Sequence, residues 1–83
     1  MLFYTYILHS SAKDKYYVGS CENIEIRLAL HNAGRNKSTK FGIPWIVKKI
    51  ETFSTRAEAT QRETHIKKMK SRKFIELVIL GER

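Results

Sequence analysis

One carboxylate in this sequence, that of Glu63, is poorly explained by local structure. Glu63 lies one helical turn from Ala59 and from Ile66, on or beside the apolar stripe of a predicted helix, so its carboxylate needs a partner. An ion pair with Arg62, Lys67 or a more distant lysine would satisfy it. A divalent cation would also satisfy it, because Mg²⁺ is commonly held by one or two carboxylates together with waters and phosphate oxygens. The residues alone leave both alternatives open.

Tyrosine, arginine and histidine side chains provide further candidates. Four tyrosines occur in the first 17 residues and none after them. Strand packing with a hydrogen-bonded hydroxyl accounts for most tyrosines of this kind, and periodicity distinguishes none of the four. Arg27 and His31 are four residues apart and therefore share one stripe of the helix predicted there.

The positive charge is concentrated in the second part of the chain. Sixteen Lys and Arg oppose eight Asp and Glu, for a net charge of +8. Residues 1–34 have three basic and three acidic side chains, whereas residues 35–83 have thirteen and five. A basic run is usually a solvated face, but this asymmetry favours contact with a nucleic-acid backbone, with steep salt dependence and little sequence specificity. The densest basic run lies between Arg62 and Lys73, and its expected substrate contacts are Lys67, Lys68 and Lys70.

The predicted elements follow the order ββαβαα. They are strands at Phe3–His9, Lys15–Ser20 and Trp45–Phe53, and helices at Ile24–Asn32, at about 56–70 and after Ser71. The intervals between strands are too short for several βαβ crossovers. We therefore predict a single α+β domain, residues 1–83, with a three-stranded antiparallel sheet flanked by helices.

Local signals set the helix boundaries. Asn23 is a favourable N-cap and Gly34 a stop signal, while Thr55 and Glu58 match a capping box. Ser71 can cap the last helix. In the long helix, the residues expected to face inward are Ala59, Ile66 and Met69.

Neither face of the first strand is clearly polar. Alternation puts Phe3, Thr5 and Ile7 on one face and Tyr4, Tyr6 and Leu8 on the other. We therefore expect both faces of the sheet to be covered.

Other catalytic patterns are absent from the sequence. It has no Gly-rich phosphate loop, paired-cysteine ligand set or His-Glu-x-x-His motif. Its single cysteine, Cys21, has no internal disulfide partner and is interpreted as a small, partly buried thiol. No secretory signal and no apolar run of bilayer length is present. We expect a cytoplasmic protein without a membrane partner.

Several motifs occur in one order along most of the chain. Tyr4-Thr5-Tyr6 is followed about ten residues later by Tyr17-Val18-Gly19, then by Arg27 and His31 on one helix and by Glu63 on a later one. Further pieces are Arg27 to Gly34, Thr39-Lys40, Pro44-Trp45 and Arg62 to Lys67. This ordered set resembles the GIY-YIG nuclease superfamily, especially its small single-domain, UPF0213-like branch and the N-terminal domain of the excinuclease nucleases. Only the tyrosine of the first triplet is kept, and His31 stands where many members have tyrosine.

The resemblance implies a metal-dependent hydrolysis of phosphodiester bonds. Glu63 would hold Mg²⁺ or Mn²⁺ against the scissile phosphate. Tyr17 would accept the proton of an attacking water, and Tyr6 would orient that water or the phosphate. Arg27 would clamp the phosphate through its fixed fork of donors, and His31 would relay a proton.

Two residues are second-rank candidates for substrate contact. Lys40 follows the polar, basic loop that begins at Gly34. The alternative to substrate contact is that Lys40 is simply a solvated surface lysine. Asn32 has an amide that can fix His31 or the backbone, and its alternative is a helix C-cap.

The leading functional interpretation is a DNA endonuclease of the repair or structure-specific type. Its partner would be nucleic acid, with DNA favoured over RNA. The alternative is a non-catalytic nucleic-acid-binding module, or a small subunit on a nuclease fold. Because the chain lacks the companion domain that gives many family members their target, a protein partner could supply specificity.

Overall fold

The computed structural model describes residues 1–83. Its elements are β1 (Phe3–Ser10), β2 (Lys15–Cys21), α1 (Ile24–Asn32), the 3-10 turn η1 (Lys40–Gly42), β3 (Trp45–Phe53), α2 (Arg56–Met69) and α3 (Arg72–Ile79). The strands form one antiparallel sheet in the order β2-β1-β3, so β2 is an edge strand. The predicted α+β class, the ββαβαα order and the three-stranded antiparallel sheet are confirmed.

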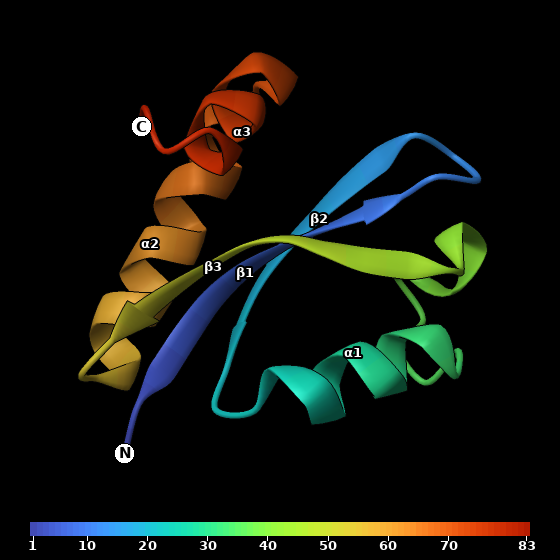
Figure 1. Cartoon of the computed structure of the whole chain (residues 1–83), viewed down its shortest axis with the longest axis horizontal. Coiled ribbons are helices and arrows are strands. Elements are labelled where there is room, and N and C mark those ends of the chain that lie inside the picture. Colours follow the sequence, from blue (N-terminus) through green and yellow to red (C-terminus); the bar gives the residue numbers. More distant parts are fainter.

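The sheet lies between α1 on one side and α2 with α3 on the other (Figure 1). Two apolar clusters fill the two interfaces. The α1 side has a buried cluster of Tyr6, Leu8, Cys21 and Trp45. The opposite side has Ile7, Val18, Ile66 and Val78. Both faces of the sheet are therefore covered, as the alternation in β1 predicts.

Side-chain caps fix the helices at the predicted places. Asn23 accepts a hydrogen bond from the first turn of α1, and Gly34 follows the helix with a φ of 76°. Thr55 and Glu58 form a reciprocal capping box at α2, and Ser71 caps α3. These local contacts give α1 and α2 defined starting points relative to the strands.

The prediction that Met69 faces inward is wrong. Ala59 and Ile66 are buried as expected, but the side chain of Met69 is 46% exposed. Met69 is the last residue of α2, and Lys70 after it adopts the left-handed conformation. The side chain therefore lines a hollow whose other walls come from α2, α3 and the C-terminal residue, and no strand covers it.

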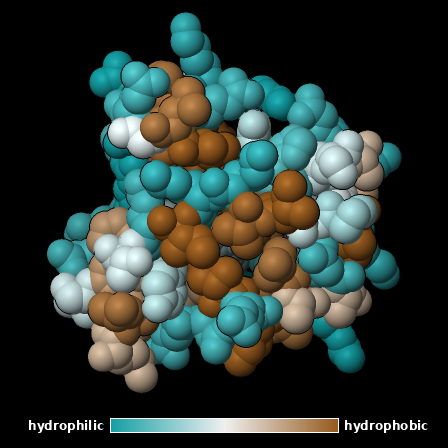
Figure 2. All heavy atoms as spheres, in the orientation of Figure 1, coloured by the Kyte–Doolittle hydropathy of each residue, from teal (hydrophilic) through white to brown (hydrophobic).

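Apolar atoms reach the surface in places. Figure 2 shows them over α3 and in a band across the middle of the molecule, with hydrophilic residues around them. None of the helices has the combination of length and hydropathy that crossing a membrane requires.

Candidate active site

Tyr6 and Tyr17 lie on the α1 side of the sheet, on neighbouring strands. Tyr6 in β1 pairs with Gly19 in β2, and the Tyr6 and Tyr17 ring centroids are 6.4 Å apart. A Cβ atom at position 19 would lie 2.5 Å from the Tyr6 hydroxyl oxygen. Gly19 therefore provides the space in which the Tyr6 ring crosses the edge strand.

A buried hydrogen-bonded chain begins at the Tyr6 hydroxyl. The Tyr6 hydroxyl is 3.0 Å from His31 Nε2, and His31 Nδ1 is 2.8 Å from the Thr39 hydroxyl. Burial raises the pKa of Tyr6 to about 12, against the opposing effect of Arg27. Burial, together with the charge of Arg27, lowers the pKa of His31. At neutral pH the phenol therefore keeps its proton and donates to Nε2, and Nδ1–H donates to Thr39.

Arg27 lies one turn before His31 on α1. Its Nε is buried and has no hydrogen-bond partner in the protein. The residue borders two hollows, one of about 270 Å³ shared with His31 and one of about 370 Å³ shared with Ser20. Arg27 thus lies between the hollow that contains His31 and the hollow that contains Ser20. Its guanidinium is suited to binding a phosphate group.

Glu63 reaches the same strand edge from α2. Its Oε1 accepts a 2.6 Å hydrogen bond from the Ser20 hydroxyl, and its Oε2 accepts one of 2.6 Å from Lys67 Nζ. Arg62 instead forms a bidentate pair with Glu51 on β3. Of the ion-pair partners considered from the sequence, the structure selects Lys67, and the Glu63 side chain remains 20% exposed.

Lys67 links the two sides of the sheet around the edge strand. While its ammonium binds Glu63, it also lies 5.6 Å from the centre of the Tyr17 ring. The Tyr17 ring also lies next to His31, with ring centroids 4.9 Å apart. Because β2 has no neighbour beyond it, side chains from α1 and from α2 can meet at Tyr17.

A basic hollow of about 430 Å³ adjoins Tyr17. Four cations line it and no carboxylate does; the cations are Lys15, Lys67, Lys70 and Arg72. Two of the predicted lysines, Lys67 and Lys70, are therefore beside Tyr17. The exposed Lys68 and Lys40 are not among the residues that line it.

Asn32 fixes the backbone, which was one of the roles considered for it. Its Nδ2 donates to the Trp45 carbonyl at 3.0 Å, and its Oδ1 accepts from the Trp45 amide at 2.6 Å. Both ends of the amide are thus used to join the end of α1 to the start of β3.

Two polar residues of the site were missed by sequence reasoning. Ser20 binds Glu63 and Thr39 ends the chain from Tyr6. Hydroxyl residues are common in loops and strands, so neither had a signal of its own. Thr39 has no exposed surface, which only the folded structure could reveal.

The donor set around Glu63 fits a weakly enclosed divalent ion. No group of three or more His, Cys, Asp or Glu side chains is clustered in the chain. Glu63 supplies one partly exposed carboxylate, with the Ser20 hydroxyl at Oε1 and the Lys67 ammonium, which a cation would displace, at Oε2. Mg²⁺ suits such a place, because it keeps several waters and takes phosphate oxygens as further ligands.

Comparisons with known proteins identify the family of this chain. The family model of the GIY-YIG catalytic domain matches residues 2–75, and nucleases of this family are generally metal-dependent. A UPF0213 protein of Bacillus licheniformis is 41% identical over 81 residues, covering 96% of this chain and 81% of the relative. One of Staphylococcus haemolyticus is 36% identical over 77 residues, covering 90% and 92%. The solution NMR structure of a UPF0213 protein from Bacillus halodurans matches with a TM-score of 0.60 and 28% identity, covering 96% and 85%. The chain therefore belongs to the GIY-YIG catalytic-domain family, among its small UPF0213 members.

Proposed function

We propose that this protein hydrolyses phosphodiester bonds in DNA with the help of Mg²⁺ or Mn²⁺. The observation that supports this most directly is the position of Tyr17, which lies next to both His31 and Lys67, the ion-pair partner of Glu63. A phenol, a carboxylate and a guanidinium at one strand edge provide a proton acceptor, a metal ligand and a phosphate clamp. Structural stability alone does not require these groups to converge.

Glu63 would hold the metal ion, with the Ser20 hydroxyl orienting the carboxylate. When bound, the ion stabilises negative charge on the phosphate and on the leaving oxygen. To bind it, Glu63 must release or share the oxygen that now accepts from Lys67. The ammonium would then remain over the Tyr17 ring, where its positive charge favours the phenolate form.

The protein's own groups would carry the proton and the phosphate. Tyr17, in its phenolate form, accepts the proton of the attacking water, and Arg27 binds the phosphate oxygens. Tyr6 orients the water or the phosphate. Since His31 has no exposed surface, we assign it to positioning the Tyr6 hydroxyl in place of the proton relay expected from the sequence.

The substrate backbone would follow the basic hollow beside Tyr17. Lys67 and Lys70 line this hollow, and Lys68 and Lys40 would extend the contact from more distant surfaces. Such contacts attract phosphate without reading bases. DNA is the proposed substrate, in repair or structure-specific cleavage, and the cytoplasm the proposed location.

A second candidate is a non-catalytic nucleic-acid-binding module. The Lys67–Glu63 ion pair favours it, because the carboxylate that would hold the metal is already neutralised by a cation. RNA as the ligand is compatible with the same positive charge.

Cleavage assays on plasmid, single-stranded and forked DNA and on RNA, with Mg²⁺ or Mn²⁺, test the proposal. Glu63→Gln is compared with Glu82→Gln, a matched change at an exposed residue near the C-terminus. Tyr17→Phe is tested in the same assay. We expect metal-dependent cleavage that Glu63→Gln and Tyr17→Phe abolish and that Glu82→Gln leaves unchanged. Salt-sensitive binding without cleavage of any substrate would support the binding module instead.

A further inference from the structure

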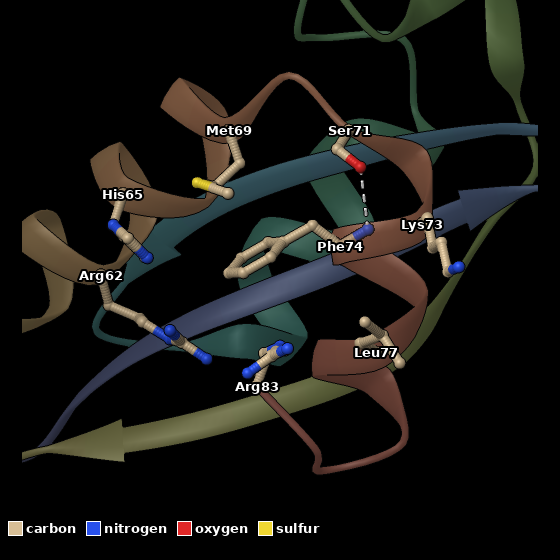
Figure 3. Close-up of a pocket in the computed structure, with 8 residues that line it drawn as sticks. All are labelled: Arg62, His65, Met69, Ser71, Lys73, Phe74, Leu77 and Arg83. Atoms are coloured by element: carbon tan, nitrogen blue, oxygen red, sulfur yellow. Dashed lines mark hydrogen bonds between the residues drawn. The ribbon is translucent and has the colours of Figure 1, made fainter.

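The largest hollow in the protein, of about 530 Å³, is not part of the candidate active site. It lies between the second half of α2 and α3 (Figure 3). Arg62, on its wall, binds Glu51 of β3, whereas Glu63 and Lys67 on the same helix face Ser20 and Tyr17 of β2. The large hollow and the Glu63–Lys67 pair are therefore on different faces of α2, while Ser71, between α2 and α3, lines both this hollow and the basic hollow beside Tyr17.

The floor of this hollow is apolar and adaptable. It is formed by Met69 from the end of α2 and by Phe74 and Leu77 from α3. Phe74 also packs against the core cluster that contains Ile66, which holds its ring in place. The unbranched side chain of Met69 is nearly half exposed and can adjust to what it contacts. A bulky apolar side chain from another molecule would fit such a floor.

The rim of the hollow is positively charged. Its polar lining includes the side chains of Arg62, His65, Lys73 and Arg83, and no Asp or Glu side chain lines it. Arg62 is already neutralised by Glu51, whereas Lys73 and Arg83 form no ion pair. Two cations are thus free to attract negative charge beside an apolar floor.

A protein segment matches this combination better than a nucleic acid does. Base stacking needs open aromatic faces, but the Phe74 ring is already in T-shaped contact with His65, with centroids 5.6 Å apart. The rest of the floor is aliphatic. Backbone phosphates alone would leave the apolar floor without a partner. Acidic side chains around a large apolar residue would satisfy both the rim and the floor.

We propose that this hollow binds an acidic segment of a partner protein. One bulky apolar side chain of the segment inserts between Met69, Phe74 and Leu77, and flanking carboxylates pair with Lys73 and Arg83. The site would bring the nuclease-like domain to a partner while its basic active-site surface stays accessible. This inference stands independently of catalysis.

Selection of random short peptides displayed on phage, on the full chain and with excess single-stranded DNA present, tests the proposal. We expect enriched peptides that combine Asp or Glu with a bulky apolar residue. Binding of the enriched peptides should fall about tenfold in a Lys73→Glu, Arg83→Glu variant. A Lys13→Glu, Lys48→Glu variant, with the same change in charge at two other exposed lysines, should bind them as the unmodified protein does.

Several results would overturn the proposal. They are the absence of enrichment, the enrichment of neutral or basic peptides, and equal binding by the two charge-reversed variants. Displacement of the peptides by the single-stranded DNA would assign the hollow to nucleic acid. Circular dichroism of both variants separates loss of binding from loss of folding, and a Leu77→Ser variant provides a second, charge-neutral test of the floor.

Discussion

Replacing Lys67 by glutamine should strengthen metal binding at Glu63. In the metal-free protein the Lys67 ammonium occupies one oxygen of the carboxylate at 2.6 Å, and a metal ion must compete with it. The Lys67 side chain is 49% exposed, so the pair is screened by solvent and contributes about 0.5–1 kcal/mol. Removal of this competition corresponds to an affinity for Mn²⁺ that is about two- to fivefold higher.

The assay is a titration of the metal-free protein with Mn²⁺, followed by electron paramagnetic resonance or calorimetry. Lys68→Gln is the matched control, because it removes one positive charge from the adjacent residue, which makes no contact with Glu63. We expect Lys67→Gln to bind Mn²⁺ more tightly than Lys68→Gln. If the two variants bind Mn²⁺ alike, or Lys67→Gln binds it more weakly, the Lys67–Glu63 ion pair does not compete with the metal.

Three further results are expected. Gly19→Ala should destabilise the fold by about 1–3 kcal/mol, because its methyl group would overlap the Tyr6 ring; an unchanged urea midpoint would show that the ring moves freely. The pKa of His31 is lowered by burial and by Arg27. The contribution of neutral His31 to the free energy of unfolding is therefore complete above the pKa of the unfolded chain, about 6.5, and is lost as the pH falls toward the lower pKa of the folded protein. Urea midpoints should therefore drop from about pH 7 to about pH 5, and drop less in His31→Gln; equal drops would contradict this. Of the cations around Tyr17, Lys15 and Lys70 form no ion pair. If each of these two contacts a phosphate, affinity for duplex DNA should fall about tenfold for a fourfold rise in salt, measured by fluorescence anisotropy; a nearly flat salt dependence would rule out this surface.

The features that sequence reasoning predicted well are local. The cap at Asn23, the capping box at Thr55 and Glu58, and the cap at Ser71 each involve residues within one turn of a helix. Such contacts depend only on residue type and spacing. The alternation in β1 is local in the same sense, since the direction of a side chain follows from its place in the strand.

The features that were missed depend on tertiary contacts. The choice of Lys67 as the partner of Glu63, while Arg62 turns to Glu51, depends on where β2 and β3 lie relative to α2. The burial of His31 depends on Thr39 approaching from a loop. The exposure of Met69 reflects the end of a helix that leaves the sheet, although its spacing from Ile66 fits the helical pattern.

The close approach of Tyr6 to Gly19 also has a consequence for how related sequences can diverge. The Tyr6 ring fills the space that a side chain at position 19 of the neighbouring strand would need. A Cβ atom at position 19 therefore excludes a large ring at position 6. Among relatives, the two positions should therefore change together: a side chain larger than glycine in the second triplet should accompany a smaller residue in the first. A combinatorial library of both positions, sorted for folded protein, should recover such compensated pairs and few chains that keep the tyrosine without the glycine.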